Sequence, residues 1–262
     1  MKPTHYDLTI RTNLENQIFD GSVDVQCVTD PILSTPSPIY ISHSIDVLHD
    51  TSELTFNSSD LTLSRPSVYS EALTSFVDVH PSVTFNEQRG RATIKLAKTL
   101  PAGSKAKLKI AYEGKLLSNM TGYYKSVWDH DGKKDYYSLT QFEVTSAISH
   151  PSFTHLTASP QATHARRAFP CWDEPLLKAT FSITMISRAN TVNLSNMPVK
   201  SEGIYSAGMD SFVDSLASSL AALRIGEVKD QWKITHFEKS PPVRIALISV
   251  VPSDTRFRCL LI

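Results

Sequence analysis

The stretch TQFEVTSAISHPSFTHLTASPQATHARRAFPCWDEP, residues 140–175, joins two chemically dense pieces through a diffuse one. The first piece carries Gln141 and Glu143. The second, ARRAFPCWDEP, places two arginines, two acids and two large aromatic residues within Ala165–Pro175. The segment between them is rich in Ser, Thr, His and Pro and has no helical or strand period, as is typical of a loop.

The second dense piece predicts a compact, ordered loop, for which a purely structural role is the default interpretation. Its two arginines can form bidentate ion pairs with its two acids, while the aromatic rings bury beside them. Its prolines restrict the backbone. The residues assigned to this motif are Arg166, Arg167, Phe169, Pro170, Cys171, Trp172, Asp173, Glu174 and Pro175.

The sequence on either side of this stretch reads as strands. In HYDLTIRTNL, the apolar residues Tyr6, Leu8 and Ile10 alternate with polar ones, which predicts a half-buried strand. Turn residues at 88–90 and at 131–132 predict two hairpins. Strands recur at short spacing through most of the chain, so we expect an all-β fold, either a β-sandwich or an open, curved pair of sheets.

One stretch has a helical period. In DSFVDSLASSLAALRI, residues 210–225, apolar side chains recur at three- and four-residue steps, and Asp210 or Ser211 can cap the first turn. A short surface helix within a long loop is the favoured interpretation, and a partner-binding helix is the alternative.

The composition is that of a globular protein with no charge bias. Of the 262 residues, 41% are hydrophobic and 20% are charged, and the formal net charge is zero. We therefore expect neither nucleic acid nor a membrane as a partner. Cys27, Cys171 and Cys259 lack metal-ligand spacing, and no export signal or membrane span is evident, so we expect a cytoplasmic protein.

The motif, followed by LLKATFSITM, resembles the N-terminal signature of the M1 family of zinc aminopeptidases. KPTHYDLTIRT, FNSSDL, LPAGSKAKLKI, YYSLTQFE, NLSNMPV and WKITHFEKSPP are similar to the family in the same order, so the resemblance covers most of Lys2–Pro242. It implies a saddle-shaped β-sandwich at the start of a longer enzyme. In complete members, a thermolysin-like catalytic domain and helical domains follow.

The resemblance also implies roles at the first dense piece. By the match to TQFE, Glu143 would hold the α-amino group of a peptide substrate, and Gln141 would line the pocket for its first side chain. A carboxylate in a partly desolvated pocket binds an ammonium group by a charge-assisted hydrogen bond. The alternative is that both are ordinary polar residues at a strand end.

The zinc-binding part of the family pattern is missing from this sequence. None of the nine histidines is followed by Glu, so there is no H-E-x-x-H motif, and G-A-M-E-N is absent too. We therefore expect no catalytic residue, metal or cofactor in this chain, although the full-length family uses zinc and acts on peptides with a free N-terminus. The alternative function is a stand-alone β-sandwich that binds peptide N-termini or a protein partner.

Three segments depart from the family pattern. Residues 27–44 and 144–161 interrupt family motifs, and removing the second gives TQFEATHARRAFPC, as the family has it. Residues 243–262 form a tail outside the expected domain of residues 1–242. We interpret all three as read-through introns, and genuine loop insertions in a stand-alone paralogue are the alternative. The tail is expected either to pair as a last strand by chance or to be an exposed, aggregation-prone segment. We expect that deleting it improves solubility or leaves it unchanged.

Overall fold

The computed structural model describes residues 2–27, 50–70, 75–77, 79–130, 132–142, 163–206 and 231–254. The predicted helix at 210–225 and Glu143 lie outside these residues, as do most of 27–44 and all of 144–161. Within the described ranges the elements are strands and short 3-10 turns, so the all-β prediction is confirmed.

The largest element is a nine-stranded sheet in the order β13-β14-β11-β1-β2-β8-β4-β5, with β15 paired to β11 beside this path. Its strands are β1 (His5–Asn13), β2 (Ile18–Cys27), β4 (Leu61–Ser70), β5 (Ser75–Val77), β8 (Ala106–Lys115), β11 (Lys178–Arg188), β13 (Val199–Tyr205), β14 (Trp232–Phe237) and β15 (Val243–Arg244). β1 pairs in parallel with β11, with Leu8 opposite Ile183, although the two strands are far apart in sequence. This pairing brings the start of the chain next to the segment that follows the arginine motif.

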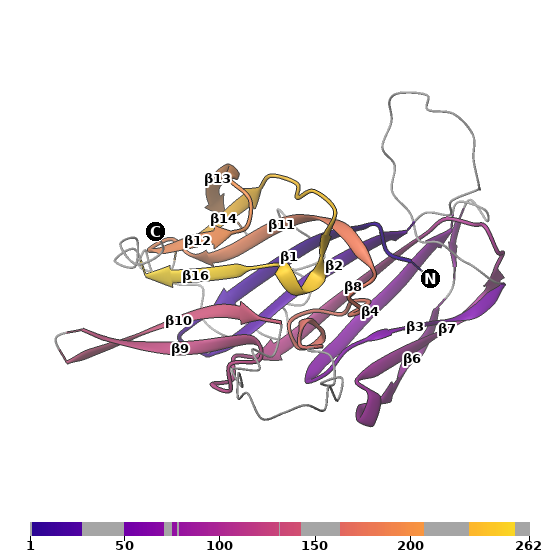
Figure 1. The fold of residues 1–262 in the computed structure, drawn as a ribbon, viewed down its shortest axis with the longest axis horizontal. Coiled ribbons are helices and arrows are strands. Elements are labelled where there is room, and N and C mark those ends of the chain that lie inside the picture. Colours follow the sequence, from indigo (N-terminus) through magenta and orange to yellow (C-terminus); the bar gives the residue numbers. More distant parts are fainter. Residues whose placement is uncertain are drawn as a thin grey trace, which may run out of the picture.

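Within the part of the chain that the structure describes, three smaller sheets accompany the nine-stranded one (Figure 1). Their strands are β3 (Thr51–Asn57), β6 (Val79–Asn86) and β7 (Arg91–Leu100) in one sheet, β9 (Gly122–His130) and β10 (Lys133–Gln141) in a ribbon, and β12 (Thr191–Ser195) and β16 (Val250–Asp254) in a pair. Both predicted hairpins are confirmed. Gly90, which follows the turn η1 (Glu87–Arg89), and Gly132 supply the positive φ angles of 55° and 76° that the turns need.

The core forms where the nine-stranded and three-stranded sheets meet. Strand β1 shows the predicted alternation, with Tyr6, Leu8 and Ile10 almost fully buried. These residues share one hydrophobic cluster with Phe56 of β3 and Ile94 of β7. The two sheets therefore pack face to face, as in a sandwich.

The tail pairs with the rest of the protein as far as Asp254. β15 pairs with β11, η4 (Ile245–Leu247) follows, and β16 pairs with β12. Ile245, Ile248 and Val250 are 2%, 3% and 0% exposed. The alternative of an exposed tail is therefore wrong for Val243–Asp254, because its apolar side chains fill part of the core.

Candidate functional site

The arginine motif folds as a tight turn, followed by a short stretch in which Cys171 forms an isolated β-bridge with Asn57. The 3-10 turn η2 (Ala165–Arg167) begins after His164, and the N–H groups of Ala168 and Phe169 both donate to the carbonyl of Ala165. Ala165 and Phe169 are fully buried. The small and apolar residues of the motif therefore face the core, which leaves the arginines at its surface.

Arg166 pairs with Asp173, as predicted, but through a single carboxylate oxygen. Its Nε and its backbone N–H donate to Oδ2 of Asp173 at 3.1 and 3.2 Å. Its Nη1 donates to the carbonyl of Arg89 at 3.1 Å, at the tip of the β6–β7 hairpin. Burial raises the pKa of Asp173, although the hydrogen bonds and charge of Arg166 act in the opposite direction.

Arg167 has a partner that the sequence did not predict. Its guanidinium pairs with Asp60, which sits in the turn between β3 and β4 at a positive φ of 58°. Glu174 is exposed and forms no ion pair with either arginine in the described structure. The two arginines therefore tie the motif to other elements in addition to closing it on itself.

The second half of the motif is bonded to the two main sheets. Cys171 and Asn57 of β3 exchange backbone hydrogen bonds at 2.7 and 3.1 Å. The Asn57 side chain also accepts from the Asp173 N–H at 3.0 Å, and the Trp172 N–H donates to the hydroxyl of Tyr6 at 3.1 Å. Burial raises the pKa of the Cys171 thiol well above its usual range, as expected of a structural cysteine rather than a nucleophile or metal ligand.

The two dense pieces of the sequence meet in space. Gln141, the half-buried last residue of β10, is followed by Phe142, which is 2% exposed. The Phe142 ring packs edge to face against Phe169, with ring centroids 6.0 Å apart and planes at 72°. Its carbonyl accepts from the N–H of His164 at 3.4 Å. The end of β10 therefore lies directly against the arginine motif.

Strand β9 begins at Gly122, against the same motif. This glycine pairs with Gln141 and has a φ of 68°. A Cβ atom at position 122 would lie 2.5 Å from Cβ of Arg167 and 3.2 Å from the carbonyl oxygen of His164. Only glycine fits both the conformation and the space. Sequence reasoning gave no role to Gly122, Phe142, Asn57 and Asp60. The family motifs FNSSDL and YYSLTQFE contain three of them, but a motif does not reveal a partner that is distant in sequence.

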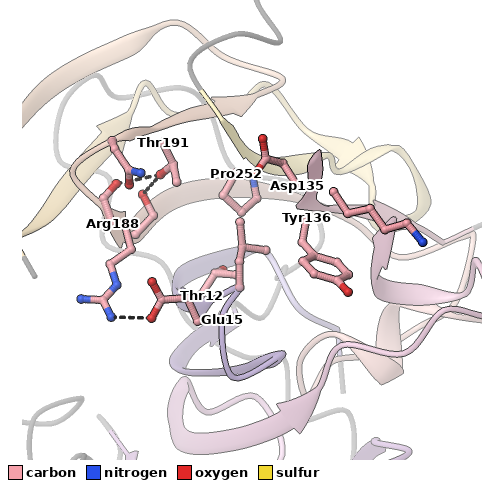
Figure 2. A pocket seen from close by; sticks show the side chains of 11 residues that line it. Thr12, Glu15, Asp135, Tyr136, Arg188, Thr191 and Pro252 are labelled. Carbon is pink, nitrogen blue, oxygen red and sulfur yellow. Dashed lines mark hydrogen bonds and ion pairs between the residues drawn. The ribbon is translucent and has the colours of Figure 1, made fainter. Parts of the chain in front are cut away.

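A separate pocket of about 190 Å³ lies between the β1–β2 turn, β10, the β11–β12 turn and Pro252 (Figure 2). Arg188 is one of its four charged lining residues, with Glu15, Lys134 and Asp135. Arg188 donates to Glu15 at 3.0 Å and lies over the ring of Trp232 at 4.7 Å. None of the predicted site residues lines this pocket, and its Arg188 guanidinium is already engaged within the protein.

The described residues do not fit the zinc that the resemblance implies. Across the described ranges, no three His, Cys, Asp or Glu side chains gather where they could hold a metal ion. Zinc sites in proteins need three or four such ligands. None of the described residues forms a helix that could span a membrane.

Comparison with known proteins agrees with the family resemblance of the motifs. The family described as Peptidase M1 N-terminal domain matches residues 2–153 and 151–220. Aminopeptidase M1-A of Oryza sativa subsp. japonica is 33% identical over 203 residues, which cover 77% of this chain and 19% of that protein. Two relatives from Saccharomyces cerevisiae, alanine/arginine aminopeptidase and "Aminopeptidase 2, mitochondrial", are each 27% identical over 97% of this chain and cover 22% and 20% of those proteins. The chain thus spans about a fifth of the length of these relatives.

Proposed function

The chain belongs to the M1 peptidase family through its N-terminal domain, and from this membership we propose that it forms the part of a zinc aminopeptidase that borders the amino end of the peptide substrate. One observation supports this most directly. The end of β10, where the family resemblance places the substrate-facing residues, is held against the arginine motif by the Phe142–Phe169 and His164–Phe142 contacts.

In this proposal Glu143 binds the α-amino group of the substrate, and Gln141 lines the pocket for the first side chain. A carboxylate and an ammonium group form a charge-assisted hydrogen bond, which is roughly twice as strong as a neutral one. A free amino end therefore binds better than a blocked one. The position of Gln141 at the end of β10, next to the anchored Phe142, supports placing both roles there.

Hydrolysis itself is proposed to depend on a zinc centre outside the residues described here. M1 aminopeptidases are zinc-dependent in general, and the relatives carry the name aminopeptidase over a much longer chain. We propose that this domain contributes substrate recognition and no zinc ligand or catalytic group. A cytoplasmic location remains part of the proposal, although one relative is named as mitochondrial.

We further propose that residues 27–44 and 144–161 are insertions within this domain. The two ranges that match the family meet at residues 151–153, inside the second segment. The flanks of that segment also lie within hydrogen-bonding distance, at Phe142 and His164. For the tail, both yeast alignments cover 97% of the chain and so include part of it, and we do not propose it as an insertion. The mature transcript across both segments tests their origin.

A binding experiment tests the proposed function. The 262-residue chain is titrated with alanyl-alanyl-alanine and with the N-acetylated form of the same tripeptide. We expect the free amine to bind about tenfold more tightly or better, since a hydrogen bond to a charged group contributes about 1.5–3 kcal/mol. Glu143→Gln should remove most of this preference and Gln141→Ala should weaken binding of both peptides.

The control is Glu174→Gln, which changes an exposed carboxylate of the nearby motif. This variant should keep the preference of the wild type. Equal binding of the free and acetylated peptides by the wild type would contradict the proposal. Binding without hydrolysis is expected of this chain both as a domain of an aminopeptidase and as a stand-alone binding module, so that result alone does not distinguish the two.

A further inference from the structure

We infer that the arginine motif is a positioning element for the substrate-facing end of β10, in addition to its part in the core. Phe169 and the backbone of His164 act as the positioning groups. This inference rests on the proposed function, because it takes the end of β10 as the place where the peptide amine binds. These residues would thus have a positioning role in addition to the structural role that the sequence predicts for them.

Two contacts hold Phe142, the residue that follows β10, from different sides. The buried Phe142 ring meets Phe169 edge to face, a geometry that aromatic pairs prefer. The Phe142 carbonyl accepts from the His164 N–H at 3.4 Å. One contact fixes the side chain and the other the backbone, so the strand end can neither rotate nor slide without breaking one of them.

The surface that Phe142 meets is itself immobilised. Phe169 is fully buried and also packs edge to face on Tyr6 of β1, with ring centroids 6.2 Å apart. Tyr6 in turn stacks on Phe181 of β11 at 4.8 Å, and its hydroxyl accepts from the N–H of Trp172. The position of the β10 end is therefore set by the centre of the nine-stranded sheet.

The partner strand of the ribbon is held in the same place. Gly122 lies opposite Gln141, and a Cβ atom there would collide with Cβ of Arg167. Both strands of the ribbon thus end on one rigid turn. A group that binds a substrate amine gains most from such support, because a misplacement of about 1 Å costs much of the interaction.

Mutations can test separately the contacts that the motif makes with the β9–β10 ribbon and those that it makes with β3. Phe169 and Gly122 lie on the side that touches the ribbon. Phe56, which is also buried and packs beside Trp172 with centroids 6.2 Å apart, lies on the side of β3. Phe169→Leu and Phe56→Leu are therefore matched core substitutions that differ in whether they touch β10.

The glycines of the ribbon provide a second matched pair. Gly122 and Gly132 both have positive φ angles, 68° and 76°, so alanine is strained at either position. A Cβ atom at Gly132 would meet nothing within 4 Å, whereas one at Gly122 would collide with the motif. Gly132→Ala therefore reproduces the backbone strain of Gly122→Ala without the collision.

The experiment measures two quantities on these four variants of the full chain. One is hydrogen exchange of the amides of residues 139–142. The other is the ratio of the affinities for alanyl-alanyl-alanine and its N-acetylated form. We expect Phe169→Leu and Gly122→Ala to speed exchange at these amides about tenfold relative to their controls. In these variants, local opening no longer has to break the full set of contacts between the strand ends and the arginine motif. The same two variants should lower the affinity ratio by about tenfold.

A merely structural role would lower the folded fraction and leave the affinity ratio of the folded molecules unchanged. Equal exchange at residues 139–142 in Phe169→Leu and Phe56→Leu, or an unchanged affinity ratio in Phe169→Leu, would overturn the inference. Failure of the proposed function looks different. In that case the wild type itself binds both peptides equally, and the exchange comparison alone decides whether the motif positions the strand.

Discussion

Arg166 joins three parts of the protein through one side chain and its own backbone. It binds Asp173 within the motif and the Arg89 carbonyl at the β6–β7 hairpin, and its carbonyl accepts from the N–H of Ser59 at 2.9 Å. Its side chain is 13% exposed and that of Asp173 is 4% exposed. Breaking a buried ion pair is costly because the remaining charge has lost its partner.

We predict that Arg166→Met destabilises the protein more than Asp173→Asn does. The first change leaves a buried carboxylate without its guanidinium and should cost about 3 kcal/mol or more. The second keeps an acceptor for the Arg166 N–H and should cost about 1–2 kcal/mol. Urea unfolding of both variants measures the difference. Equal losses would contradict this prediction, because they would show that a guanidinium without the Asp173 charge costs as much as a carboxylate without Arg166.

His164 gives the motif a dependence on pH. Burial lowers the pKa of His164 below its usual 6.5, and the charge of Arg167 lowers it further. The contribution of this histidine to stability is therefore complete above pH 6.5 and is lost as the pH falls through its lowered folded pKa. We predict that His164→Gln makes the stability less dependent on pH between 7 and 5. Thermal unfolding across this range checks it, with the exposed His236→Gln as the control. A steeper dependence in His164→Gln would contradict the sign.

At the scale of elements, the two ends of the segment that connects β10 to η2 lie next to each other in the structure. The N–H of His164 reaches the carbonyl of Phe142 with the whole of 144–161 between them. Without that segment, Glu143, Ala162 and Thr163 would remain as the connection. The same hydrogen bond would then close an ordinary α-turn.

We predict that deleting Val144–Gln161 preserves the fold and raises the free energy of unfolding by about 1–2 kcal/mol. The gain is entropic, because each halving of a flexible loop favours closure by about 0.6 kcal/mol. Chemical denaturation of the shortened chain measures it. A clear loss of stability would mean that the segment makes contacts of its own, which would count against its being an insertion.

Strand β16 carries part of the core although it lies in the tail. Its Val250 N–H donates to Oγ1 of Thr140 at 3.0 Å, and that hydroxyl donates to the Ile248 carbonyl at 3.3 Å. The strand therefore bonds to β10 as well as pairing with β12. The earlier expectation that the tail is dispensable no longer holds for Val243–Asp254.

We predict that a chain ending at Pro242 yields little folded protein. It loses three buried apolar side chains, Ile245, Ile248 and Val250, each of which contributes about 1.5–3 kcal/mol. The sum approaches the whole stability of an ordinary domain. A chain ending at Asp254 keeps β16 and is the matched control. Val250→Ala, which should cost about 1–2 kcal/mol, gives a graded version of the same test by calorimetry. Normal folding of the Pro242 chain would contradict the assignment of β16.

At the scale of the whole molecule, stability comes from sheets packed on one core and from the motif that links them. In the described ranges no cluster of ligands suited to a metal takes part. We predict that prolonged dialysis against a chelator changes the unfolding temperature by less than about 1 °C, since a metal bound to the folded state would raise it by mass action. Calorimetry before and after dialysis, with elemental analysis, measures this. A large drop that zinc reverses would show a site among the remaining residues.

Much of the fold follows from local patterns. The alternation of Tyr6, Leu8 and Ile10 predicts a strand with one buried face, and the structure confirms it. Gly90 and Gly132 mark turns because each lacks the Cβ that a positive φ would strain. Such signals lie within a few neighbouring residues, so they can be read without knowing the rest of the fold.

The candidate site was predictable only in part, because each of its contacts has a distant partner. The order of the motifs identifies the family, and the pairing of Arg166 with Asp173 lies within one short stretch. The partner of Arg167 is Asp60, and the partner of Phe169 is Phe142. No local period could single out either of these partners.

Periodicity, turn chemistry and a dense ordered motif were enough to predict most of the strands, the two hairpin turns and the family. The tertiary structure alone decided that β1 runs parallel to β11, that β16 completes the core and that both dense pieces of residues 140–175 meet at Phe142 and Phe169. These features depend on how separate sheets pack. Packing depends on the area that whole sheet faces bury and on how well their shapes fit, and no short stretch of sequence specifies either.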